Sequence, residues 1–364
     1  MLSRTADHLF WMARYMERAE NTARMLDVNY QTSLLPQSEE EAERGWRGLL
    51  GISELSSDFA TRYGHINARN AMDYMVRDER NPSSIVSCLH AARENARAVR
   101  GTLTTEVWET QNQTWLEFQR VARSADFQRD PSQLFEWVKF RSHLSRGVTV
   151  GTMLQDEAFH FLRIGSFLER ADNTARLLDV KFHAVASEYN AGFGGDGFGG
   201  SGFGALTAAA SGPARVQSQS QSNSQGADPA SAAEPPPTTL RDTEVDFYHW
   251  SAILRSVSGF EVYRKAYRNV IRPEKVAELL ILRPDMPRSL ACCMQEVEGN
   301  LSRVANDLSS GTLRLAGRLR ADLQYAQIDE ILATGLHAFL TQFLERVGNL
   351  GVGISRDFLV PMKA

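Results

Sequence analysis

Two stretches of the sequence carry the same ionic side chains at helical spacing. Residues 15–28 (YMERAENTARMLDV) and 167–180 (FLERADNTARLLDV) align without a gap, and ten of the fourteen positions are identical. Glutamate, asparagine and arginine recur in each stretch at steps of four and three, so they share one face of a helix beside an apolar seam. The retained polar residues are Glu17, Arg18, Asn21 and Arg24 in the first copy and Glu169, Arg170, Asn173 and Arg176 in the second.

Two uses of this polar face are consistent with its chemistry. In the first, the carboxylate, amide and guanidinium groups are buried between helices and bond to one another, because a buried charge persists only when it is paired. In the second, they line a cleft and hold a ligand, because the planar guanidinium can bind a carboxylate or phosphate through two hydrogen bonds. The sequence alone leaves both uses open.

The two motif glutamates are weak candidates for acid–base catalysis. Glu17 and Glu169 could in principle act as a catalytic pair of carboxylates. Each is followed directly by an arginine, however, and has another arginine seven residues further on the same face. Positive neighbours keep a carboxylate ionised, so neither should donate a proton near neutral pH. Salt-bridged structure is therefore the expected use, and no catalytic residue is assigned.

Metal and cofactor sites are not predicted. Glu157 and His160 have the i, i+3 spacing of carboxylate-bridged metal sites in helical bundles. The counterpart of His160 in the first copy is His8, but the counterpart of Glu157 is Thr5, so we expect a histidine at a helix interface. The sequence contains no nucleophile motif, Walker loop or dinucleotide fingerprint. We therefore expect no cofactor.

Two weaker candidate sites lie near the C-terminus. Residues 343–349 (FLERVGN) repeat the Glu-Arg pair as Glu345 and Arg346, which indicates a third, motif-like helix. Residues 263–268 (YRKAYR) contain the bases Arg264, Lys265 and Arg268 between two tyrosines. This basic segment could bind an acidic peptide or a phosphate. The alternative is a solvated basic face whose tyrosine rings pack inward.

The elements that must position these residues are helices. No stretch before residue 187 alternates with period two for long enough to predict a strand, so the fold class is all-α. Helix starts are indicated at Ser38, where glutamates follow in the first turn, and at two dipeptides in which a capping residue precedes a proline, Asn81-Pro82 and Asp130-Pro131. Asn81 is expected to cap a helix that begins at Ser83.

The chain is internally duplicated around an inserted tract. Trp250 corresponds to Trp46 at an offset of 204, and residues 286–293 correspond to residues 81–88 at an offset of 205. We expect a first repeat over 1–187 with both motif helices, and a second over 241–364. Residues 188–240, rich in Gly, Ser, Gln and Pro, have too little apolar surface to offset the entropy of ordering and are expected to be disordered. The repeats should form one continuous bundle.

Composition excludes several classes of protein. The formal charge is −4, and 40 basic residues are spread among 44 acidic ones, so no nucleic-acid-binding surface is predicted. No apolar run approaches the roughly 18 residues that span a bilayer, and the charged N-terminus does not resemble a secretory signal. The three cysteines lack metal-binding spacing and are typical of buried thiols in a reducing compartment. The expected location is the cytoplasm.

The repeated helix, the later Pro-Ser segment and the segment YRKAY together resemble the Alpha-E family of bacterial all-helical proteins, known for a Glu-Arg motif. The resemblance runs from about Leu2 to Ile354 and fails only in the inserted tract. In that family the domain is found beside, or fused to, a circularly permuted ATP-grasp enzyme and a transglutaminase-like protein. The resemblance therefore implies those two partners, a peptide ligand, and a role in ATP-dependent peptide-bond synthesis or peptide modification.

From these observations we expect an accessory or peptide-presenting helical subunit that works with an ATP-grasp ligase. One alternative is an enzyme in its own right, which would use the duplicated Glu, Arg and Asn cluster on a peptide or amino-acid substrate. A self-associating scaffold is a third. Whether the protein is an enzyme is left open.

Overall fold

The computed structural model describes residues 1–52, 55–192, 247, 250–268 and 270–359, with the backbone alone over 181–192. All regular secondary structure in these described residues is helical, with no strand, which confirms the prediction of an all-α fold. Residues 193–240 of the inserted tract, which are predicted to be disordered, lie outside the described residues.

The helices of the first half include the first motif helix and the helices that pack against it or against its neighbours. They are α1 (Ser3–Ser33), α2 (Glu39–Ile52), α3 (Ser56–Tyr63), α4 (Ala68–Val76), α5 (Ile85–Ala98), the short 3-10 helix η1 (Arg100–Thr102), α6 (Thr105–Val121), α7 (Ala125–Arg129) and α8 (Pro131–Thr152). The first motif lies in the middle of α1.

The helices of the second half follow the same order around the second motif helix. They are α9 (Glu157–Gly192), a helical stretch over 250–256, α11 (Phe260–Tyr267), α12 (Pro273–Leu282), α13 (Leu290–Arg303), α14 (Ser310–Tyr325), α15 (Ile328–Thr334) and α16 (Leu336–Phe358). The second motif lies in the middle of α9.

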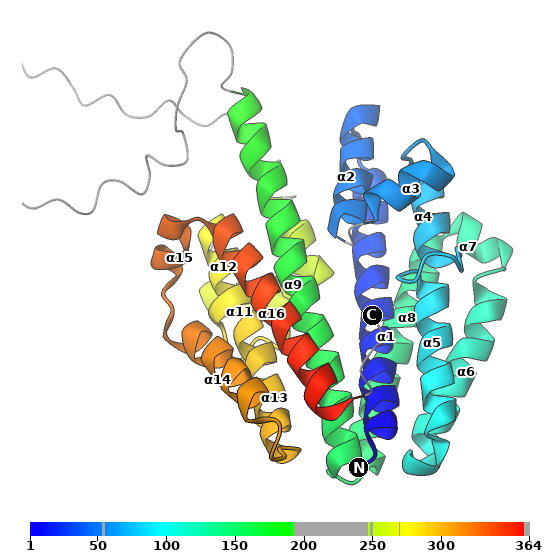
Figure 1. The fold of residues 1–364 in the computed structure, drawn as a ribbon. Helices are drawn as coiled ribbons and strands as arrows, with labels where there is room; N and C mark the ends of the chain where they lie inside the picture. The colour runs from blue at the N-terminus through cyan, green and yellow to red at the C-terminus, as the bar shows by residue number, and fades with distance from the viewer. Residues whose placement is uncertain (53–54, 193–246, 248–249, 269, 360–364) are drawn as a thin grey trace, which may run out of the picture.

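The two motif helices lie side by side at the centre of the bundle and begin at the same end (Figure 1). Helices α5, α6 and α8 lie on the α1 side, while α13, α14 and α16 lie on the α9 side. Small residues allow α1 and α9 to approach closely: a Cβ atom added to Gly165 would lie 2.3 Å from the Phe10 carbonyl oxygen and 3.3 Å from the Ala13 Cβ. The structure therefore brings the two motif faces into contact.

Equivalent residues in the two halves make equivalent interactions. His8 Nδ1 lies 2.8 Å from Asn95 Oδ1, and its counterpart His160 Nδ1 lies 2.8 Å from Asn300 Oδ1. Both histidines thus lie at a helix interface, as predicted. The indole rings at the matched positions 46 and 250 are both buried. The sequence duplication is therefore also a duplication of the structure.

The structure confirms two of three predicted helix starts and contradicts the third. The start at Ser38 is confirmed, because its backbone N–H and side chain exchange hydrogen bonds with Glu41, and the Asp130 cap is confirmed as well. The prediction for Asn81 is wrong: its buried side chain bonds the Tyr74 carbonyl and the Ser83 N–H in a turn, and Ser84 caps α5 instead.

The backbone of helix α9 is described as far as Gly192, so the first residues of the predicted inserted tract continue this helix.

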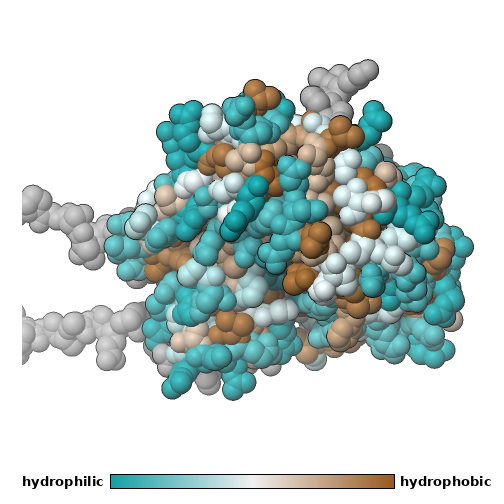
Figure 2. Space-filling model, turned by 90° about the horizontal axis from the view of Figure 1, so that it is seen from below, coloured by the Kyte–Doolittle hydropathy of each residue, from teal (hydrophilic) through white to brown (hydrophobic). Residues whose placement is uncertain are grey.

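The surface of the bundle is mixed. Seen from the end where α1 and α9 begin, hydrophobic side chains are interleaved with hydrophilic ones (Figure 2). Among the described residues, no helix is both long and apolar enough to cross a membrane.

Candidate functional site

The two motif helices are joined by a reciprocal pair of ion pairs. Arg170 of α9 donates to Glu17 of α1 through Nε and Nη2, each 2.9 Å from a carboxylate oxygen. In return, Arg18 of α1 donates to Glu169 of α9 over 2.5 and 3.1 Å. Each guanidinium binds its carboxylate through two bonds, the strongest geometry for such a pair. The Glu-Arg motif therefore links the two halves of the molecule.

A larger ionic network surrounds the α1 carboxylates. We name it the α1 cluster, and it consists of Glu17, Glu20, Asn21 and Arg24 of α1 with Arg146 of α8, Arg170 of α9 and Arg288 before α13. Glu17 and Glu20 are 1% and 0% exposed. Burial alone would raise their pKa values, but the surrounding guanidiniums, led by Arg170 for Glu17 and Arg288 for Glu20, hold both pKa values below the ordinary one. Both carboxylates are therefore ionised at neutral pH.

The α1 cluster carries excess positive charge. Four guanidinium groups surround two carboxylates, so two positive charges are not balanced within the cluster. Burial lowers the pKa of Arg288, and the like charges of Arg170 and Arg24 act in the same direction, although Glu20 and Glu17 oppose them. The nearby His143 also has a lowered pKa, mainly because its surroundings partly desolvate the imidazole. An anion bound at this cluster would relieve the charge repulsion.

The corresponding network on α9 is smaller and more open. We name it the α9 cluster. It contains Glu169 of α9 with Arg14 and Arg18 of α1, the separate Asp172–Arg176 pair, and Asn173, which lines a cavity beside them. Burial alone would raise the pKa of Glu169, but Arg14 and Arg18 lower it to about 2. The Asp172–Arg176 pair is only partly buried, with side chains 27% and 29% exposed. One face of the α9 cluster can therefore be reached from outside.

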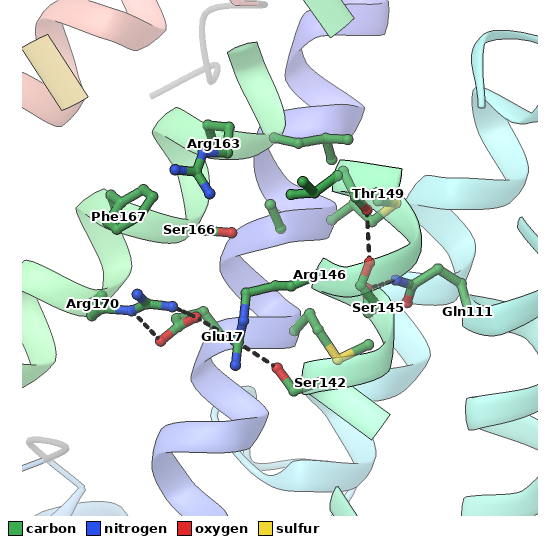
Figure 3. A pocket seen from close by; sticks show the side chains of 15 residues that line it. Glu17, Gln111, Ser142, Ser145, Arg146, Thr149, Arg163, Ser166, Phe167 and Arg170 are labelled. Carbon is green, nitrogen blue, oxygen red and sulfur yellow. Dashed lines mark hydrogen bonds and ion pairs between the residues drawn. The ribbon is translucent and has the colours of Figure 1, made fainter. Parts of the chain in front are cut away.

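A cavity of about 240 Å³ lies beside the α1 cluster, between α1, α8 and α9. We name it the α8 cavity. Figure 3 shows Arg146, Arg163 and Arg170 around it, with the hydroxyl groups of Ser142, Ser145 and Ser166 on its walls. Gln111 of α6 also lines it, and the Gln111 Oε1 atom is buried without a hydrogen-bond partner among the described residues. This cavity is rich in groups that bind oxygen-bearing anions.

A second cavity, of about 180 Å³, lies beside the α9 cluster and next to α2. We name it the α2 cavity. Its polar lining consists of two arginines, two carboxylates and four uncharged side chains: Arg18, Arg176, Glu169, Asp172, Asn21, Thr22, Ser83 and Asn173. The polar face predicted from the sequence is thus buried between helices and also borders two cavities.

The remaining predicted residues lie away from these clusters. Glu345 is exposed, and Arg346 binds Asp322 of α14, because α16 packs against α9 and α14 as α8 packs against α1 and α6. The interpretation of α16 as a third motif helix is therefore wrong. The bases of the predicted basic patch, Arg264, Lys265 and Arg268, are exposed, while Tyr263 is buried, as in the solvated-face alternative.

Three important residues were missed by sequence analysis. Glu20 corresponds to Asp172 in the second copy of the motif, and this conservative exchange of one acid for another was a usable signal. Arg146 and Arg288 have no basic counterpart at the matched positions, so the duplication gave no indication of them. Their roles depend on tertiary packing.

The described residues contain few groups suited to other chemistry. No group of three or more His, Cys, Asp or Glu side chains in the described part of the chain is arranged to hold a metal ion. Burial raises the pKa of Cys88 and of its counterpart Cys293 to about 12, so both thiols stay protonated and unreactive at neutral pH.

Fold and site together define a duplicated all-α bundle whose central helices are joined by reciprocal glutamate–arginine pairs. The chain belongs to the Alpha-E family, described as a predicted alpha-helical domain with a conserved ER motif, which matches residues 1–206 and 218–359. The sequence-based family prediction is confirmed.

The chain is also similar to uncharacterised proteins of Mycobacterium bovis and of two strains of Mycobacterium tuberculosis, at 30% identity over 206 residues. The match covers 50% of this chain and 22% of each relative, so the chain spans less than a quarter of their length. No solved structure matches the chain.

Proposed function

We propose that the protein is a non-catalytic accessory subunit that holds a peptide through a carboxylate group in the α8 cavity and works with an ATP-grasp ligase. The observation that carries this proposal is the excess of guanidinium groups beside that cavity. Arg146 and Arg170 belong to the positively charged α1 cluster, and Arg163 lines the same cavity from α9. Arginine binds carboxylates in a fixed two-bond geometry, and the neighbouring hydroxyls can add further hydrogen bonds.

The state of the motif carboxylates supports binding over catalysis. Glu17 and Glu169 are buried and bonded to guanidiniums, and the pKa of each is lowered. A general acid needs a pKa near the working pH, and a paired carboxylate with a low pKa does not meet that need. The two glutamates therefore act as anchors for arginine side chains.

The partnership with a ligase is supported by membership of the Alpha-E family. An ATP-dependent ligase acts on a carboxylate group, so a subunit that binds carboxylate-bearing peptides would supply its substrate. A transglutaminase-like protein, which also acts on peptides, is the second partner class that the family resemblance implies.

The carboxylate site is tested by titrating the protein with a peptide that has a free C-terminus and with the same peptide amidated. The variant Arg163→Gln should weaken binding of the free peptide about tenfold, the effect of one charge-assisted hydrogen bond. Arg320→Gln is the matched control, because Arg163 and Arg320 each pair with a glutamate of α13 but only Arg163 lines the cavity. Equal binding by both variants would contradict the site.

The partnership is tested separately by co-purification and by ATP turnover. The ligase should retain this protein on a column, and its peptide-dependent ATP hydrolysis should rise when the protein is added. Equal turnover with and without the protein would contradict the accessory role.

A further inference from the structure

Position 83 in the first half corresponds to position 288 in the second. Each residue immediately precedes a serine that caps the following helix: Ser84 accepts a hydrogen bond from the Ser87 N–H, and Ser289 accepts one from the Cys292 N–H. The backbone around the two positions is thus alike, but the side chains differ. The first half has serine where the second half has Arg288.

Arg288 reaches from the α13 side across to three acceptors on α1. Its guanidinium lies 2.7 Å from Asn21 Oδ1, 2.6 Å from Glu20 and 3.1 Å from Glu17. These contacts fill the space between α1, α9 and the turn before α13.

The counterparts of these three acceptors all line the α2 cavity. At the repeat offset they are Asn173, Asp172 and Glu169, and Ser83 lines the same cavity. The cavity therefore occupies the place that an arginine side chain fills in the other half. Its volume of about 180 Å³ far exceeds the roughly 15 Å³ that a single water requires.

Among the acceptors in the α2 cavity, Glu169 has unused capacity, whereas both oxygens of Asp172 already accept from Arg176. Glu17 accepts hydrogen bonds or ion pairs from three guanidiniums, while Glu169 pairs with two, those of Arg14 and Arg18, among the described residues. An ionised carboxylate offers about four lone-pair positions. Glu169 can therefore accept from one more guanidinium, as Glu17 does.

A second, independent observation at the α2 cavity concerns the side chain of Asn21. It is 3% exposed and lines the α2 cavity, and its Oδ1 is held by Arg288. Its Nδ2 has no hydrogen-bond partner among the residues that the structure describes. A buried amide donor without a partner is costly, and the residue that carries this donor lines the α2 cavity.

We propose that the α2 cavity binds the arginine side chain of a peptide. The guanidinium would donate to Glu169, Asp172 and Asn173 as Arg288 donates to Glu17, Glu20 and Asn21. A carbonyl oxygen of the same peptide would accept from Asn21 Nδ2. A planar guanidinium matches three fixed acceptors better than an ammonium group does. This inference deepens the proposed function, since it names the side chain by which the peptide is recognised, and it concerns a different cavity.

The test is a calorimetric or NMR titration with N-acetyl-arginine-methylamide, with the citrulline and lysine analogues and free arginine as comparison probes. The capped arginine should bind most tightly, and the uncharged citrulline analogue at least tenfold more weakly. Asp172→Asn should weaken binding about tenfold, while Asp322→Asn, an exposed aspartate paired with Arg346, should not change it. Ser83→Arg should abolish binding by filling the cavity, and Ser83→Ala should preserve it.

Three results would overturn the proposal. They are equal binding of the arginine and citrulline probes, unchanged binding to both Asp172→Asn and Ser83→Arg, or tighter binding of free arginine than of the capped form. Because these variants leave the α8 cavity intact, a failure here is distinguishable from a failure of the carboxylate site, which Arg163→Gln reports.

Discussion

The α1 cluster and the α9 cluster are built on the same fourteen-residue motif but have different surroundings. In the α1 cluster, Arg146 and Arg288 close over Glu17 and Glu20, which are 1% and 0% exposed. In the α9 cluster, the position of Arg288 is taken by Ser83, and a cavity remains there. The motif therefore determines the reciprocal pairs between α1 and α9, while residues outside the motif determine whether each cluster is sealed or open.

The largest expected difference between the clusters is the cost of removing the motif glutamate. Glu17→Gln leaves Arg146, Arg170 and Arg288 without one of their carboxylates, and it should lower the free energy of unfolding by about 3–5 kcal/mol. Glu169→Gln should fall at the lower end of this range, about 3 kcal/mol, because Arg14 and Arg18 are partly exposed and can turn to solvent. Urea denaturation measures both. Equal losses would remove the distinction between sealed and open clusters.

Acidification should destabilise the protein through carboxylates of both clusters. The pKa of Glu169 is about 2 in the folded protein against an ordinary value of 4.5, so its contribution is complete above pH 4.5 and is lost as the pH falls toward 2. The full contribution is about 3 kcal/mol, of which about 2 kcal/mol is lost by pH 3. Urea midpoints at pH 6 and pH 3 should show this loss, and Glu169→Gln should show a shallower one. An equal fall in the urea midpoint for the unmodified protein and for Glu169→Gln would contradict the pairing of Glu169 with Arg14 and Arg18.

The close contact of α1 and α9 is tested at Gly165. A Cβ atom at this position would meet the backbone oxygen of Phe10, so Gly165→Ala should force the helices apart and cost about 1–3 kcal/mol. Gly147→Ala on α8 is the control: a Cβ there meets nothing within 4 Å, and alanine favours a helix by about 0.5–1 kcal/mol. Thermal unfolding of the two variants should therefore shift in opposite directions. A shift in the same direction would mean that the two helices do not depend on this contact.

The smallest expected effect is that of Asp172→Asn. Asp172 is the counterpart of the buried Glu20, but its pair with Arg176 is partly exposed and lies within one helix turn. Such a pair contributes about 0.3–0.5 kcal/mol. The melting temperature should therefore stay nearly constant, and a large fall would show that the α9 cluster is as closed as the α1 cluster.

The sequence predicted the parts of the molecule that depend on local pattern and on repetition. The all-α class followed from helical periodicity, and the motif residues followed from their retention in two copies. Arg146 and Arg288 could not be predicted, because each enters the site from a helix or turn far away in the chain and neither is repeated. Glu345 was wrongly grouped with the motif, since a short local match does not show which helix occupies the equivalent place in the bundle.

The central claim is that Glu17 and Arg170 form a direct link between the two halves. A double-mutant cycle with Glu17→Gln, Arg170→Gln and the combined variant measures their coupling in the free energy of unfolding. The reciprocal-pair account predicts a coupling of about 1–3 kcal/mol. Additive effects, within about 0.5 kcal/mol, would contradict it.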